Sequence, residues 1–150
     1  MEVSLNQFFS VELDSTTKSP EVTELIFKIR DYFKNKSYGD DICSYLIGVI
    51  CVHPNYDQFF KVGRPKYVED RTVVYEKILG PTHIYKTFSF DIKLNFEEFI
   101  SSNTEDGLKM IAGSIMETVR TLKYPKKIKD FDKEKFYEDL RLFFEKEKIL

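Results

Sequence analysis

The sequence predicts an α+β fold, in which a single antiparallel sheet of about four strands has helices packed on one face. Residues 88–96 alternate without interruption between apolar and polar side chains, and the apolar members are Phe88, Phe90, Ile92, Leu94 and Phe96. Because successive side chains of a strand point to opposite faces, this stretch predicts a long strand with one buried and one solvated face. Helices can then cover only one side of the sheet, which excludes a doubly wound parallel fold.

Helical spacing predicts the layer that covers this sheet. Ser19-Pro20-Glu21 is a typical helix start, because serine caps, proline fits the first turn and glutamate faces the positive end of the dipole. Gly39 predicts the end of this helical region. Ser102 and Glu105 match a capping box. The helix after it has an apolar stripe formed by Leu108, Ile111, Ala112, Ile115, Val119 and Leu122. A last helix is predicted to begin at Asp130 or Asp132, with an inner stripe of Phe136, Leu140 and Phe143.

Three more segments have the patterns of strands. Val3–Leu13 alternates, Tyr45–Val52 is a nearly continuous β-branched run, and Tyr67–Leu79 alternates again before a Gly80-Pro81 turn. The predicted order is therefore β-α-β-β-β-α-α. A length of 150 residues suits one domain, so we expect residues 1–150 to form a single unit.

Composition narrows the classes of function. The net charge of −2 gives no overall attraction to nucleic acid or to an anionic membrane. No basic and apolar leader precedes a cleavage site, and no apolar run approaches the ~20 residues that span a bilayer. We therefore expect a cytoplasmic protein with reduced thiols.

Residues that could perform catalysis or bind metal are sparse. Cys43, Cys51, His53 and His83 do not have the spacing of a zinc site, and Cys51 lies in the most apolar strand, which would raise its thiol pKa. No nucleophile elbow, phosphate-binding loop or dinucleotide fingerprint is present. Glu97 and Glu98 are better explained as a solvated strand end than as an acid–base pair. We therefore predict no enzymatic activity, no metal and no cofactor.

Charge and aromatic residues suggest a binding surface. Residues 1–60 contain five basic and nine acidic side chains, a net charge of −4. Their acidic residues at predicted strand ends and loops are Glu12, Asp14, Asp40, Asp41 and Asp57. These are either ordinary solvated turns or a surface that steers a basic protein partner. Tyr56, Phe59 and Phe60 lie in a predicted loop at 55–66, where aromatic side chains would serve as binding anchors.

A basic cluster formed by Lys123, Lys126, Lys127 and Lys129 follows the predicted 108–122 helix. Lysines near a helix C-terminus interact favourably with the helix dipole, and only Tyr124 and Phe131 accompany them as aromatic side chains on which nucleic-acid bases could stack. A solvated link explains this cluster better than contact with phosphates.

The C-terminal half carries a family resemblance. The chain has a strand ending in Phe96-Glu-Glu-Phe99, a following helix to Lys123, and the pattern D-F-D-x-E-x-x-x-x-D from Asp130 to Asp139. These features resemble the immunity-44 family of bacterial polymorphic-toxin immunity proteins, of the contact-dependent inhibition type. The resemblance implies a cytoplasmic protein that binds a cognate toxin domain and neutralises it without catalysis.

Two other classes of function remain open. One is a small-ligand or nucleic-acid-binding regulatory domain without catalytic activity, which would use the polar face of the sheet. The other is an enzyme of unrecognised type. Salt-dependent binding to DNA or RNA would favour the regulator, whereas a toxin gene directly upstream would favour the immunity protein. The sequence leaves open which toxin is neutralised and the oligomeric state.

Overall fold

The protein combines helices with a small open sheet. The computed structural model describes residues 1–8, 19–39, 42–52, 82–84, 86–124 and 128–150. Its elements, in chain order, are β1 (Glu2–Phe8), α2 (Ser19–Phe33), β2 (Ser44–Val52), β3 (Thr82–Ile84), β4 (Thr87–Asn95), α4 (Phe96–Ser101), α5 (Thr104–Thr121) and α6 (Lys133–Lys146).

The strands pair mainly in parallel, so the prediction of an antiparallel sheet is wrong. The described strands have the order β1-β2-β4-β3, with β1 parallel to β2 and β2 parallel to β4. Among them, only the short β3 runs antiparallel to its neighbour, β4. Helix α2 connects β1 to β2, which is the kind of crossover that parallel neighbours need. The alternation of apolar and polar side chains indicates which face of a strand is buried, but it does not indicate the direction of the neighbouring strand. The prediction was wrong for this reason.

Several predicted strand residues cannot be compared with the structure. The strand predicted at 67–79 lies outside the described residues, as do Phe9, Val11 and Leu13 of the first predicted strand. Within the described part, β3 pairs with β4, and Lys86 between them has a φ of 62°. The Lys86 carbonyl accepts hydrogen bonds from the backbone N–H groups of Cys43 (2.8 Å) and Ser44 (3.2 Å), which ties this turn to the start of β2.

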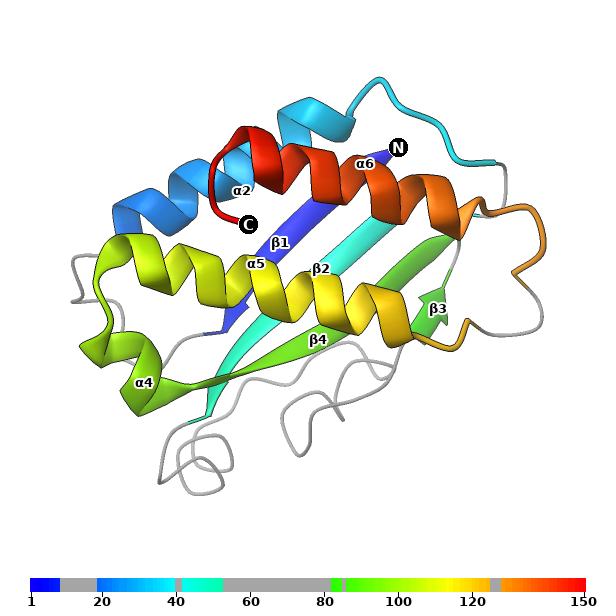
Figure 1. Cartoon of the computed structure of the whole chain (residues 1–150). Helices are drawn as coiled ribbons and strands as arrows, with labels where there is room; N and C mark the ends of the chain where they lie inside the picture. The colour runs from blue at the N-terminus through cyan, green and yellow to red at the C-terminus, as the bar shows by residue number, and fades with distance from the viewer. Residues whose placement is uncertain (9–18, 40–41, 53–81, 85, 125–127) are drawn as a thin grey trace.

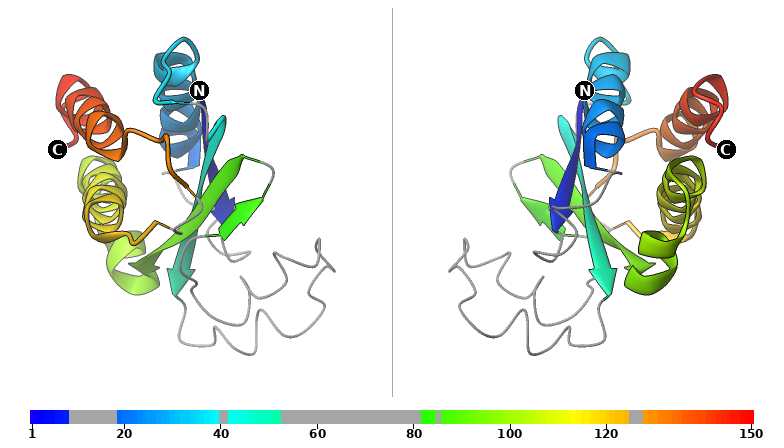
Figure 2. Two further views of the ribbon diagram at one scale, coloured as in Figure 1. Left: turned by 90° about the vertical axis from the view of Figure 1, so that its right-hand side faces the viewer. Right: turned by 90° about the vertical axis from the view of Figure 1, so that its left-hand side faces the viewer.

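Helices α2, α5 and α6 lie side by side over one face of the sheet, as Figures 1 and 2 show. The prediction for the buried face of β4 is confirmed for Phe88, Phe90, Ile92 and Leu94, each at most 2% exposed. The strand ends one residue before Phe96, which begins α4 instead. On the helix side the core contains Ile111, Ile115 and Val119, with Leu108 partly buried against it.

Helix α2 begins at the predicted start and buries an apolar stripe along one side, with Ile26 partly buried beside it. Val22, Leu25, Ile29 and Phe33 are at most 4% exposed. Helix α6 is capped by Asp132, whose carboxylate accepts from the Lys135 N–H at 3.1 Å. Its buried residues are Phe136, Leu140, Phe143 and Phe144, which include the three that were predicted.

The capping box predicted at Ser102 and Glu105 is wrong, because the chain forms two helices there. Asn95 caps the short α4 by accepting from the Glu98 N–H at 3.0 Å, so Glu97 and Glu98 lie in a helical first turn rather than at a strand end. Asn103 caps α5 by accepting from the Asp106 N–H at 2.7 Å. Ser102 is the C-cap of α4, and its hydroxyl donates to the Phe99 carbonyl at 2.7 Å.

Gly39 does not end α2, which stops at Phe33, but allows a close contact between distant segments. Its φ is 115°, and a Cβ at this position would lie 1.5 Å from the Asp130 carbonyl oxygen. The neighbouring Tyr38 carbonyl accepts a hydrogen bond from the Asp132 N–H at 2.7 Å. Glycine is required because any side chain would displace the segment that leads into α6.

We expect Ile92→Ala to lower the free energy of unfolding by about 2–5 kcal/mol, because Ile92 is buried under the helices and truncation leaves a cavity. Chemical denaturation measures this change. Lys109→Ala, on the exposed side of α5, is the control and should change stability by less than about 0.5 kcal/mol. An equal, small effect of both substitutions would contradict the burial of this β4 face.

Two glycine substitutions should have opposite effects. Gly39→Ala should destabilise the fold by about 2 kcal/mol or more, because of its positive φ and the Asp130 contact. Gly113→Ala in α5 should stabilise it by up to about 1 kcal/mol, because nothing lies within 4 Å of the added Cβ and alanine favours helix. Thermal unfolding of the two variants tests the pair, and a neutral Gly39→Ala would refute the role assigned to this glycine.

Candidate functional site

The binding residues predicted from sequence all lie outside the described residues, so their role stays a prediction. They are Glu12, Asp14, Asp40, Asp41, Tyr56, Asp57, Phe59 and Phe60. In the described part of the chain, the candidate binding surfaces are the outer sides of the three long helices and the hollows between elements.

The candidate metal ligands are only partly described. Cys43 is an exposed free thiol ahead of β2, Cys51 lies in β2 and His83 in β3, while His53 lies outside the described residues. Within the described ranges, no group of three or more His, Cys, Asp or Glu residues is arranged to hold a metal ion. None of the helices in these ranges is long and apolar enough to cross a membrane.

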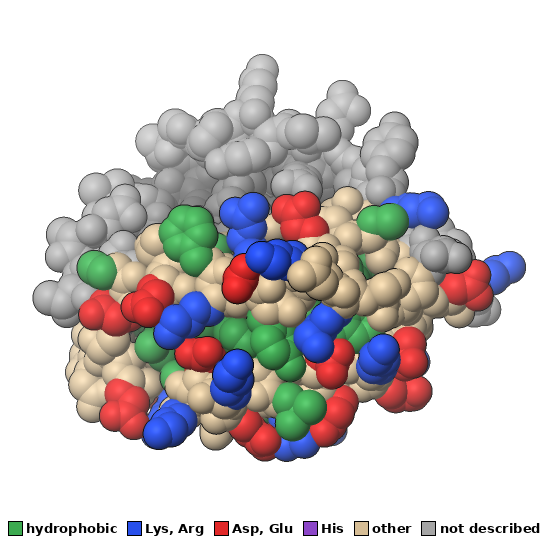
Figure 3. Space-filling model, turned by 90° about the horizontal axis from the view of Figure 1, so that it is seen from above, with side chains coloured by type: hydrophobic (Ala, Val, Ile, Leu, Met, Phe, Trp, Pro, Cys, Tyr) green, Lys and Arg blue, Asp and Glu red, His purple; other side chains and the backbone are tan. Residues whose placement is uncertain are grey.

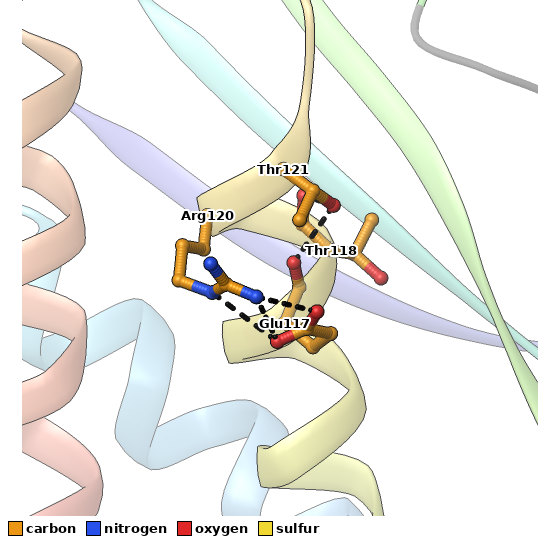
Figure 4. Close-up of polar contacts among 4 residues, drawn as sticks. All are labelled: Glu117, Thr118, Arg120 and Thr121. Atoms are coloured by element: carbon orange, nitrogen blue, oxygen red, sulfur yellow. Dashed lines mark hydrogen bonds and ion pairs between the residues drawn. The ribbon is translucent and has the colours of Figure 1, made fainter.

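Short-range ion pairs cover much of the helix surface. Arg120 and Glu117 on α5 form a fork, with Nη2 to Oε1 at 2.7 Å and Nε to Oε2 at 3.2 Å (Figure 4). On α6, Arg141 pairs with both Glu138 and Glu145. Figure 3 shows basic and acidic side chains interspersed over the face seen from above. Such exposed pairs contribute about 0–1 kcal/mol each, and they keep this surface solvated.

A hollow of about 240 Å³ lies between the end of α5 and the start of α6. Its described lining is Val119, Arg120, Leu122, Tyr124, Lys133, Glu134 and Tyr137. The Lys133 Nζ lies 5.7 Å from the centroid of the Tyr124 ring, within the range of a cation–π contact. The lining mixes aliphatic, aromatic and both signs of charge, and it does not bring a nucleophile next to a base.

A hydrogen-bonded pair of tyrosines, the buried Tyr45 and the partly buried Tyr124, lies at the end of α5. The hydroxyl oxygens of Tyr45 on β2 and Tyr124 after α5 are 2.9 Å apart and share a hydrogen bond. Burial raises the pKa of Tyr124 to about 12, and burial, with Tyr124 beside it, holds the pKa of Tyr45 well above its ordinary value. Both phenols therefore remain neutral at physiological pH, which suits a structural tie between sheet and helices.

A second polar tie joins α6 to the segment after α2. The buried Tyr38 hydroxyl donates to Asp139 Oδ2 at 2.5 Å, and Lys36 Nζ lies 4.0 Å from the same oxygen. Burial, followed by the bond and charge of Asp139, raises the pKa of Tyr38. This cluster lies beside the Gly39 contact, so it fixes the approach of the 36–39 segment to α6.

Another hollow, of about 550 Å³, lies along the outer side of α2. Its described lining is Glu2 of β1, Phe27, Arg30 and Asp31 of α2, and Lys34 directly after that helix. Phe27 is 62% exposed, more than Leu142 and Leu150, which are the other large hydrophobic residues exposed in the described part of the chain. Phe27 is therefore an exposed aromatic residue surrounded by charged side chains, an arrangement that also occurs at protein interfaces.

Sequence reasoning missed Phe27, although a signal was present. The inner stripe of α2 runs through Val22, Leu25, Ile29 and Phe33, and Phe27 falls on the opposite side of that helix. A large apolar residue off the buried stripe of an amphipathic helix has no core to enter.

We expect stability to decrease as pH rises above about 10. Tyr38, Tyr45 and Tyr124 have raised pKa values in the folded protein, so the unfolded chain loses these protons first. Their contribution is complete below pH 10 and is lost as pH rises through the folded pKa, which is about 12 for Tyr124. Tyrosinate absorbance and circular dichroism, followed together, test this. Ionisation of all nine tyrosines near pH 10 with the fold intact would contradict it.

Comparison with known proteins assigns the family. The sequence model described as Immunity protein 44 matches residues 1–146 of the 150-residue chain. No curated protein and no solved structure shows significant similarity to the chain. The match extends from β1 to the last turn of α6 and so includes every helix and strand described above. The chain therefore belongs to the Immunity protein 44 family.

Proposed function

We propose that this protein binds a cognate bacterial toxin domain and neutralises it by direct protein–protein contact. The observation that supports the proposal is the family match over residues 1–146. Immunity of this kind needs a complementary surface and no chemistry of its own, and such proteins are generally non-catalytic. We further propose that neutralisation takes place in the cytoplasm, within a polymorphic-toxin system of the contact-dependent inhibition type.

The acidic N-terminal part is the proposed electrostatic determinant of binding. Residues 1–60 have a net charge of −4, whereas residues 61–150 have a net charge of +2. A partner with a basic surface would be attracted to the acidic part, and complementary charge of this kind mainly accelerates association. The proposed contacts are Glu12, Asp14, Asp40, Asp41 and Asp57.

Aromatic residues of the 55–66 segment are the proposed anchors. Tyr56, Phe59 and Phe60 follow the Tyr45–Val52 strand and precede Gly63 and Pro65. Aromatic side chains dominate the energetics of protein interfaces when a partner desolvates them. In this proposal, charge brings the toxin to the surface and the aromatics slow its release.

We expect Asp40→Lys combined with Asp41→Lys to slow association with the toxin domain and to weaken its dependence on salt. Phe59→Ala or Phe60→Ala should mainly speed dissociation, at a cost of about 1–2 kcal/mol of binding free energy. Binding kinetics against the product of the adjacent toxin gene measure both effects.

Matched controls separate contact from folding. Glu97→Lys with Glu98→Lys makes the same change of charge on the exposed α4, and Leu142→Ala truncates an exposed apolar residue on α6. Neither control should alter the two rates, and circular dichroism confirms that each variant folds. If the 40/41 and 59/60 variants behave like the controls, the toxin does not bind at these residues. Asp91 and Lys93, which the alternating sequence predicts on the polar face of the sheet, are then the next candidates.

A further inference from the structure

We propose that the outward side of α2 is a self-complementary surface through which two copies of this chain associate in an antiparallel manner about Phe27. This surface, which we call the α2 outer stripe, comprises Pro20, Thr23, Glu24, Phe27, Arg30, Asp31 and Lys34. The inference goes beyond toxin binding, because it assigns a different surface and a different partner.

The α2 outer stripe is continuous and unpaired with the core. All seven residues are exposed, and they follow spacings of three and four residues along the helix, so they share one side of it. Phe27 is the single large apolar side chain of this stripe and is 62% exposed. The stripe borders the 550 Å³ hollow whose other wall includes Glu2 of β1. A second helix can therefore approach Phe27 without displacing a described element.

The charges are arranged for a second copy of the same helix. When two identical helices pair antiparallel about a two-fold axis at Phe27, the residue three positions after Phe27 faces the residue three positions before it in the partner. Arg30 then faces Glu24, and symmetry repeats this opposite-charge pair on the other side of the axis. Asp31 faces Thr23, whose hydroxyl can donate to a carboxylate, and Lys34 faces the uncharged Pro20. No like charges meet in this register.

The intramolecular contacts leave these groups available. Arg30 forms no ion pair within the described part of the chain, although it is a guanidinium suited to bidentate contact with a carboxylate. Among the described residues, Glu24 forms an ion pair only with Lys28, at 3.2 Å, and both of these side chains are about half exposed or more, at 64% and 47%. Asp31 and Lys34 already pair with each other at 2.8 Å, so they form a neutral margin.

The size of the surface predicts a weak dimer. Helix α2 has 15 residues and is therefore about 22 Å long. Two such helices with their neighbouring residues would bury less surface area than a standard protein–protein interface, which buries roughly 1,600 Å². We therefore expect a dissociation constant in the micromolar range, with monomer predominant at low concentration.

Sedimentation velocity of the full chain, without toxin, over about micromolar to millimolar concentration tests the proposal. The wild-type protein should show a reversible monomer–dimer equilibrium. Phe27→Asp should weaken it at least about tenfold, as expected for an interface anchor. Leu142→Asp, the matched change at the exposed apolar residue of α6, should leave the dissociation constant unchanged.

A charge exchange tests the antiparallel register. Arg30→Glu and Glu24→Arg should each weaken dimerisation, because each places like charges opposite one another, and the double variant should restore it. Circular dichroism establishes that all variants fold. Failure of the double variant to recover would overturn the register. A wild-type protein that remains monomeric at millimolar concentration would overturn the proposal. If in that case Phe27→Asp weakens toxin binding instead, the α2 outer stripe belongs to the toxin interface.

Discussion

Burial of one face of β4 is the constraint on which the rest of the described structure depends. Phe88, Phe90, Ile92 and Leu94 present a continuous apolar surface, and it needs a cover of matching length. Helix α5 provides that cover with Ile111, Ile115 and Val119, and β2 beside β4 adds Tyr45 and Ile47 to the same layer. Burial of these side chains is the main favourable contribution to folding, since each one is worth about 1.5–3 kcal/mol.

Aromatic residues extend this core toward α6. The rings of Tyr45 and Phe136 have centroids 4.4 Å apart, and those of Phe88 and Tyr124 are 4.7 Å apart. The tyrosine hydroxyls in this cluster keep hydrogen-bond partners, so the aromatic rings can be buried without leaving a polar atom unpaired. The Gly39–Asp130 approach closes the same cluster from outside, which joins segments about ninety residues apart in sequence.

The division between interior and surface fits a protein whose function is recognition. The described polar ties at Tyr38 and Tyr45 hold helices to the sheet, and their phenols stay neutral, so they serve the scaffold. The ion pairs along α5 and α6 lie on the outer side of these helices, where they contribute little to stability. A scaffold of this kind leaves the outer sides of its helices available to a partner, as the proposed binding of a toxin domain requires.

The sequence by itself determined which residues of β4, α2 and α6 are buried, because alternation and helical spacing directly record which side chains avoid water. It also indicated the family, through the Phe96-Glu-Glu-Phe99 motif, the helix that follows it and the pattern from Asp130 to Asp139. Only the tertiary structure decided the parallel pairing of β1, β2 and β4, since strand direction depends on which distant segments meet. The caps at Asn95 and Asn103 depended on where the chain turns between α4 and α5, which local capping motifs left ambiguous. Likewise, the role of Gly39 depends on the close approach of Asp130, which is distant in sequence. The exposure of Phe27 depends on which side of α2 faces the core.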